Sequence, residues 1–137
     1  MAEDTSTLVR LKDTDLTVES TDDVRGMSVV DRDGEQIGTV DTLVIDEKEK
    51  RVRFLEVGSG GFLGIGEEKR LVPVDAVVRV DEDAVRVDTT RETIRSGPGY
   101  DPDVVEYEPE YFGDVYGYYG FSPFWAPGYV YPRPFLR

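Results

Sequence analysis

The chain has 137 residues, a formal net charge of −13, and neither cysteine nor histidine. This composition excludes disulfides, thiolate or imidazole chemistry and histidine-ligated metals, and it disfavours nucleic acid as a partner, because neutralising phosphates requires clustered Lys and Arg. The acidity indicates a well-solvated surface or, alternatively, adaptation to high salt. No apolar run approaches the roughly 20 residues of a membrane-spanning helix and no signal-peptide pattern is present, so we expect a cytoplasmic protein without membrane insertion.

Two short apolar runs between residues 8 and 18 flank a polar turn. They predict a weak hairpin that covers an edge of a sheet, where backbone groups would otherwise lie unpaired. Gly26 then marks the entry to the main domain.

Four apolar runs joined by short polar turns follow between residues 29 and 57, and they predict a meander of strands. Ile37 and Val40 would lie on opposite faces of a regular strand. We therefore expect a bulge or sharp coil at Gly38, because a small barrel must bend its strands.

The fourth run, residues 51–57, breaks its own alternation. Val52 and Phe54 share one face, but Leu55 and Val57 then fall on the face of the two arginines. Either a second bulge reverses the phase, or the outer face of this strand is also covered. We favour cover, which places Leu55 and Val57 on a contact surface.

Residues 58–66 form a glycine-rich loop that follows a strand. It matches neither GxGxxG nor GK[ST], and a strand rather than a helix follows it, so the amide cradle for a phosphate is missing. Two interpretations stay open: Phe62, Leu63 and Ile65 fold back onto the barrel rim, or they are presented to a partner protein.

Residues 71–80 and 84–88 predict the last two strands, and residues 89–95 one short helical turn before Gly97-Pro98-Gly99. Pro73 falls on the outward phase and predicts a sheet edge, because it cannot donate a ladder hydrogen bond. The predicted core consists of Ile37, Val40, Ile45, Val52, Phe54, Val72, Val74, Val78, Val80, Val85 and Val87.

The composition changes from Tyr100 onward, where aromatic residues, proline and glycine dominate. Residues 115–128 follow neither a period of 2 nor one of 3.6, which predicts irregular structure. The segment is either an extended, largely disordered tail or a strap laid over the barrel or over a neighbouring subunit. Its candidate contact residues are Tyr118, Tyr119, Phe121, Phe124 and Trp125.

Most carboxylates lie in turns, which does not favour a paired-carboxylate hydrolase. The turn at Asp31, Asp33 and Glu35 faintly resembles a calcium loop, but it lacks glycine at the sixth position, and Thr42 stands where the bidentate glutamate should be. We therefore expect no enzyme activity, no catalytic residues, no cofactor and no metal site.

Four segments together resemble the PRC-barrel family, which is named for the cytoplasmic domain of the photosynthetic reaction-centre H subunit. They are Val29–Val40 (VVDRDGEQIGTV), Val44-Ile45-Asp46, Gly60–Gly66 (GGFLGIG) and Leu71–Asp75 (LVPVD). The resemblance spans residues 22–95 and implies a small SH3-like β-barrel used for protein–protein contact. Relatives serve in photosynthetic complexes, ribosome maturation and archaeal cell division, but this chain lacks the transmembrane helix of the H subunit.

We therefore predict an all-β protein with an N-terminal β extension (1–21), a PRC barrel (22–95) and an irregular aromatic/Pro/Gly-rich tail (96–137). Its expected function is that of an interaction or assembly module for a protein partner, itself included as a homodimer. The alternatives are an accessory subunit of a membrane-bound photosynthetic or electron-transfer complex, which rests on fold analogy alone, and a ribosome-assembly factor. The candidate surface consists of Leu55, Val57, Phe62, Leu63, Ile65, Tyr118, Tyr119, Phe121, Phe124 and Trp125.

Overall fold

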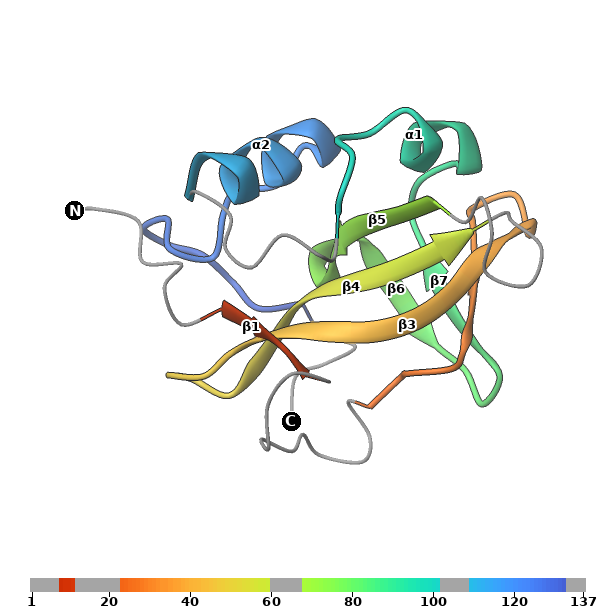
Figure 1. Cartoon of the computed structure of the whole chain (residues 1–137), viewed down its shortest axis with the longest axis horizontal. Coiled ribbons are helices and arrows are strands. Elements are labelled where there is room, and N and C mark those ends of the chain that lie inside the picture. Colours follow the sequence, from red (N-terminus) through yellow and green to blue (C-terminus); the bar gives the residue numbers. More distant parts are fainter. Residues whose placement is uncertain (1–7, 12–22, 60–67, 102–108, 133–137) are drawn as a thin grey trace.

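The computed structural model describes residues 8–11, 23–59, 68–101 and 109–132. A seven-stranded sheet curls into a half-barrel, with two short helices on one side of it (Figure 1). The elements are β1 (Leu8–Arg10), β2 (Ser28–Val30), β3 (Gln36–Asp46), β4 (Arg51–Ser59), β5 (Glu68–Pro73), the 3-10 turn η2 (Val74–Ala76), β6 (Val77–Val80), β7 (Ala84–Val87), α1 (Arg91–Arg95) and α2 (Pro109–Tyr119).

Six strands follow the order β5-β4-β3-β2-β7-β6, and β1 pairs with β3 beyond the end of β2. All pairings are antiparallel except that of β2 with β7, which brings Val29 beside Val85. The strand β1 lies in the predicted N-terminal hairpin, whose second half falls outside the described residues. Pro73 ends β5, which among the described strands pairs only with β4 and is therefore an edge strand, as predicted.

Bulges bend the two longest strands. Ile37 is an extra residue in the pairing of β3 with β2, next to the glycine where a bend was predicted. Asp41 is an extra residue in β3, and Arg53 one in β4, where these two strands pair with each other. Each bulge shifts the alternation of inward and outward side chains by one residue. The bulge at Ile37 lets both Ile37 and Val40 enter the core.

The bulge at Arg53 corrects one prediction. Leu55 and Val57 do not lie on an outer face; both are buried in the main core together with Val52. Phe54 points to the opposite side of the sheet, where it is buried in a second apolar cluster. The bulge and the outer cover, treated as alternatives from the sequence, are therefore both present.

The main core otherwise holds the predicted strand residues, with two exceptions, Val78 and Val80. Val78 is 58% exposed, because η2 interrupts the alternation and Val77 turns inward in its place. Val80 is half-buried and packs against the core. The predicted residues found in the main core are Ile37, Val40, Ile45, Val52, Val72, Val74, Val85 and Val87.

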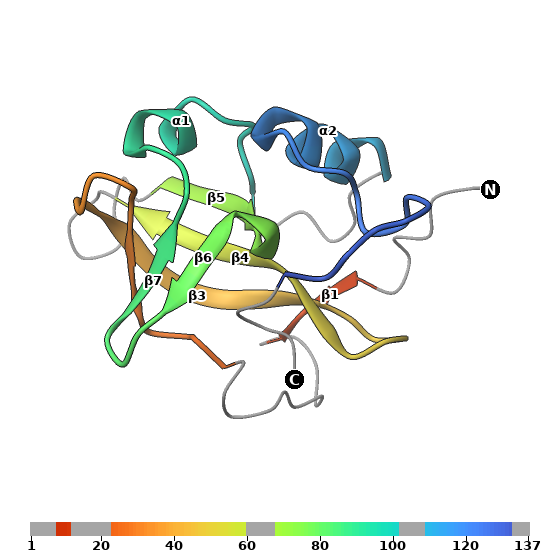
Figure 2. The ribbon, with the colours of Figure 1, turned by 180° about the vertical axis from the view of Figure 1, so that it is seen from behind.

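We call residues 109–132, which comprise α2 and the segment after it, the strap. The strap lies over the barrel, so the interpretation as a disordered tail is wrong for these residues, and α2 corrects the prediction of irregular structure. Phe112, Val115 and Tyr116 share one helix face and pack on Phe54, and this packing outweighs the low helix propensity of the glycines within α2. Figure 2 shows the strap from behind, running from α2 along the barrel.

Candidate interaction surface

The outer face of β4 carries a buried arginine beneath the strap. The bulged residue Arg53 is 2% exposed, and its Nη2 donates to Asp46 Oδ2 at 3.4 Å and to Glu49 Oε2 at 3.2 Å. Its guanidinium carbon also lies 4.3 Å from the ring centroid of Phe124 and 5.6 Å from that of Tyr131. Carboxylates on one side and aromatic rings on the other compensate the burial of this charge.

A second arginine repeats this chemistry at the rim of the same face. The guanidinium carbon of Arg51 lies 4.3 Å from the ring centroid of Tyr131. The hydroxyl of Tyr131 donates to the carbonyl oxygen of Val52 at 2.9 Å, between the two arginines. One strap tyrosine therefore binds β4 both through its ring and through its hydroxyl.

Two further tyrosine hydroxyls tie the strap to other elements of the barrel. Tyr118 donates to the carbonyl oxygen of Thr93 in α1 at 2.6 Å, and Tyr129 donates to Asp75 Oδ2 in η2 at 2.8 Å. Burial raises the pKa of the Tyr129 hydroxyl far above its usual value, and the neighbouring carboxylate of Asp75 adds to the effect. The hydroxyl therefore stays protonated as a donor throughout the physiological range.

Asp75 is a half-buried carboxyl at the seam between barrel and strap. Burial raises its pKa above the usual aspartate value, against the opposing hydrogen bond from Tyr129 and the charge of Arg53. Its other oxygen, Oδ1, is buried and makes no hydrogen bond of normal geometry with any described residue. On the same face, Arg53 Nε is also buried without a hydrogen bond of normal geometry to any described residue, so neither of these two charged groups is fully satisfied.

An aromatic cluster completes the surface. The ring of Phe54 lies 5.0 Å from that of Tyr116 and 5.6 Å from that of Phe112, between centroids. Trp125 packs edge-to-face on Tyr116 at 5.9 Å and on Phe124 at 5.1 Å. Tilted and edge-to-face contacts of this kind are favourable between aromatic rings. They hold the strap on the barrel without backbone hydrogen bonds of the kind that join strands.

Residues 17–94 match the PRC-barrel domain, which is more than half of the chain. The chain belongs to the PRC-barrel family. The match contains every barrel strand from β2 to β7 and ends within α1, so the strap lies outside it. No curated protein matches the chain. Among the residues that the structure describes, no helix is long and apolar enough to cross a membrane.

The structure separates the ten residues predicted to form the contact surface of this PRC-barrel protein. Leu55 and Val57 are in the core, as described above, and three loop residues lie outside the described residues: Phe62, Leu63 and Ile65. The five strap residues lie together against the barrel, and of these Tyr118 remains 40% exposed: Tyr118, Tyr119, Phe121, Phe124 and Trp125.

Sequence reasoning missed Arg53, Asp75, Tyr129 and Tyr131. The only local signal for Arg53 was the broken alternation after it, because an arginine in a strand is normally placed in solvent. Nothing local marks Asp75 or Tyr129, since 54 residues separate them in the chain.

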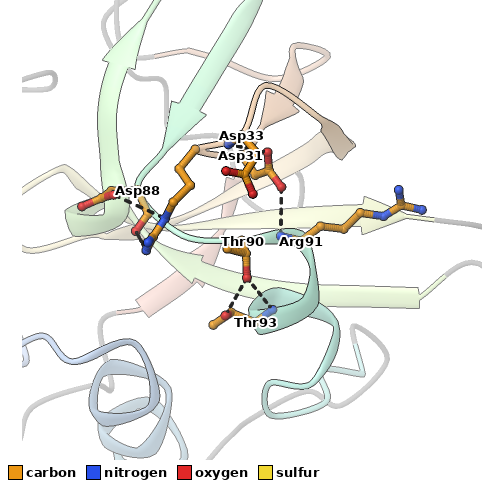
Figure 3. A network of polar contacts seen from close by, with 7 residues as sticks. Asp31, Asp33, Asp88, Thr90, Arg91 and Thr93 are labelled. Carbon is orange, nitrogen blue, oxygen red and sulfur yellow. Dashed lines mark hydrogen bonds and ion pairs between the residues drawn. The ribbon is translucent and has the colours of Figure 1, made fainter.

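The acidic turn that faintly resembled a calcium loop has a structural role in the PRC barrel (Figure 3). The Asp31 carboxylate accepts the backbone N–H groups of Glu35 and Asp33, both at 2.9 Å, and that of Arg91 at 3.1 Å. These donors, that of Glu35 foremost, hold the pKa of Asp31 below its usual value. The contact joins the turn to the start of α1, where Thr90 caps the helix by accepting the N–H of Thr93.

A buried ion pair fixes β1 to the same barrel. Glu56 is fully buried, and both of its oxygens accept from Arg10, at 2.9 Å and 3.0 Å. This bidentate ion pair compensates the buried negative charge of Glu56, which would otherwise destabilise the sheet. The polar side chain of Glu56, on the part of β4 away from the strap, therefore makes its contacts within the chain.

Proposed function

We propose that this PRC-barrel protein is a non-enzymatic interaction and assembly module of the cytoplasm, and that the outer face of β4 and β5 is its contact surface. The observation that carries the proposal is the strap itself. This face holds an aromatic segment, outside the family domain, through stacked arginines and tyrosine hydroxyls rather than through a backbone ladder. Docking of an amphipathic helix on an apolar surface is one of the recurring ways in which protein domains bind peptide segments.

The chemistry of the face defines what it recognises. Val44, Phe54 and Leu71 form an apolar floor, and Arg51 and Arg53 present cations to aromatic rings. An aromatic segment with few rotatable bonds loses little conformational entropy on binding such a floor. A partner protein with a similar segment would occupy the face in place of the strap.

A second copy of the chain is one such partner. The sequence-based argument for a dimer relied on Leu55 and Val57 as outer-face residues, and their burial removes that support. The strap gives a different basis, because the contact it makes within one chain can form equally well between two chains. Homodimerisation therefore stays a prediction.

Deletion of residues 100–137 tests the proposed surface. The bare face exposes Phe54 and its apolar neighbours, so we expect the shortened barrel to associate or precipitate in light scattering. A synthetic peptide of residues 109–132 should then bind in trans and restore a soluble complex. The same peptide carrying Phe124→Ser and Tyr131→Ser is the control and should not do so.

The outcomes separate the possible arrangements. A shortened chain that forms a well-behaved dimer would place the dimer contact on the barrel itself rather than on the strap. A soluble, monomeric shortened barrel that ignores the peptide would contradict both the proposed surface and the dimer.

A further inference from the structure

The main core of the barrel is complete without the strap. All of its buried members lie between residues 11 and 94, and the strap contributes half-buried side chains at the edge of this core, those of Tyr119, Phe121 and Tyr131. In Figure 1, α2 lies outside the curled sheet and contributes no strand to it. The strap can therefore leave the barrel without separating paired strands or opening the main core.

The strap is held together by contacts of its own. The N–H of Phe121 donates to the carbonyl oxygen of Tyr116 at 2.9 Å, and Trp125 packs on both Tyr116 and Phe124, so that α2 and the segment after it stabilise each other. The strap reaches the barrel through side chains, namely ring packing on Phe54 and the tyrosine hydroxyls described above. Contacts of this kind break together when the strap lifts off.

Docking of the strap leaves polar atoms buried at its seam with the barrel. Arg53 Nε, Asp75 Oδ1 and the Tyr116 hydroxyl are buried without a hydrogen bond of normal geometry to any described residue. The three groups interact electrostatically, and the attraction between Arg53 and Asp75 offsets part of the cost of their burial. Each of the three atoms still opposes docking, because water would solvate it on an open face. The apolar gain from docking is therefore partly cancelled.

With the strap docked, the chain offers little apolar surface to other proteins. Among the described residues, three large apolar side chains are exposed, and they come from β6, α2 and the end of the strap: Val78, Tyr118 and Val130. The apolar floor beneath α2 is buried. The surface that the proposed function assigns to a partner is therefore inaccessible while the strap covers it.

We infer that the strap is an autoinhibitory segment, which lifts off as one unit from a barrel that stays folded and so controls access to the contact surface. The inference rests on the proposed function and names how that surface is regulated. Because the strap and the barrel belong to one chain, the strap meets the face at an effective concentration on the order of millimolar. The apparent affinity of a partner is therefore reduced by the fraction of chains in which the strap is open.

Urea unfolding of the full chain tests whether the strap opens independently. Trp125 is the only tryptophan in the sequence and lies in the strap, so its fluorescence reports docking, whereas the circular dichroism of the strands reports the barrel. We expect the fluorescence transition at a lower urea concentration than the dichroism transition. In hydrogen exchange, strap amides such as that of Phe121 should exchange roughly 100-fold faster than the ladder amides of β3 and β4. Coincident transitions, or equal protection of strap and ladder amides, would overturn the inference.

Capture of the synthetic peptide of residues 109–132 tests whether the strap blocks the face. A full-length variant carrying Phe124→Ser and Tyr131→Ser has a loosened strap, and in calorimetric titration it should bind the peptide at least tenfold more tightly than the parent. Val130→Ser is the matched control and should bind like the parent, because Val130 is 80% exposed in the same segment. Equal binding by the parent and the double variant would overturn the inference. The urea and exchange measurements on the parent decide the matter if the double variant does not fold.

Two outcomes distinguish this inference from its foundation. If the parent captures the peptide as tightly as the barrel shortened by residues 100–137, the strap does not block the face; the autoinhibition then fails and the proposed contact surface stands. If neither the shortened barrel nor the double variant captures the peptide, the proposed contact surface is itself wrong, and the inference that rests on it fails as well.

Discussion

At the scale of single residues, the strap depends on charges that are buried on the outer face of β4. Arg53 donates to Asp46 and Glu49, and the ring of Phe124 in the strap covers its guanidinium group. The same residue creates the bulge that turns the next side chains into the core. One position therefore couples the packing of the core to the docking of the strap.

Arg53→Ala should lower the free energy of unfolding by about 3–5 kcal/mol, because it leaves the buried carboxylate of Asp46 without its cation. Arg51→Ala removes only a stacking contact at the rim and should cost about 0.5–1 kcal/mol. Urea unfolding of the parent and both variants measures these losses in the free energy of unfolding. Equal losses in the two would show that Arg53 is not the buried anchor.

Asp75 makes stability depend on pH. Its folded pKa is raised by burial, so its contribution is fully present below the unfolded pKa and is lost as pH rises through the folded pKa. Asp75→Asn removes this dependence, and the variant should gain stability relative to the parent as pH increases from about 4 to about 8. Parallel urea titrations across that range check the sign, and an increasing advantage of the parent would contradict it.

At the scale of elements, close approach between strands explains the glycine in β3. A Cβ at Gly38 would lie 2.1 Å from the carbonyl oxygen of Gly58 in β4, whereas a Cβ at Gly117 in α2 would meet no atom within 4 Å. A side chain is therefore excluded by the neighbouring strand at Gly38 but has space at Gly117. Gly38 permits the bent barrel to close, and Gly117 only weakens its helix.

Gly38→Ala should cost about 2 kcal/mol or more, since backbone must move to admit the methyl group. Gly117→Ala, the matched control, should stabilise the protein by roughly 0.5–1 kcal/mol, because alanine favours the helix without meeting a neighbour. Thermal unfolding of both variants measures the difference. A neutral Gly38→Ala would show that β3 and β4 separate easily at this point.

The strands and the short helix α1 could be predicted from the sequence because their signals are local: β-branched runs, turns and a threonine cap. The phase of β4 could not, because the bulge at Arg53 depends on its pairing with β3. The helix α2 was missed for a related reason. Phe112, Val115 and Tyr116 are correctly spaced for one helix face, but that face becomes apolar enough only against Phe54, a partner distant in sequence.

The site was harder to predict than the fold. The five strap residues predicted as contact residues pack within the chain, and their role toward a partner stays a prediction; the sequence marks them because large aromatic side chains favour burial. Asp75 and Tyr129 carry no such local mark, since a carboxylate and a tyrosine are both ordinary on a surface. Only the folded chain brings them together.

At the scale of the whole molecule, a net charge of −13 is spread over a small surface. Repulsion among these charges opposes the compact state, and salt screens it over distances of about 3 Å at 1 M. The buried pairs Arg10–Glu56 and Arg53–Asp46 are shielded from salt by their burial. Salt therefore relieves repulsion more than it weakens attraction.

We expect the Tm to rise as KCl is increased to about 1 M. A variant carrying Glu82→Lys and Asp83→Lys, both exposed, reduces the magnitude of the negative net charge and should show a smaller rise in Tm. Differential scanning calorimetry of both proteins gives the comparison. A Tm that falls with salt would indicate that surface ion pairs, rather than repulsion, dominate the electrostatics.

The strap is the last described part of the chain to leave the ribosome, and this order has a consequence for assembly. The barrel strands that it covers end at Pro73, so the face of β4 and β5 is complete before the strap has been synthesised. At about 5–20 residues per second, the residues from α1 to the end of the strap take on the order of several seconds to appear. During that interval the nascent barrel presents an uncovered aromatic-binding face, and any partner waiting beside the ribosome meets it before the chain's own strap does.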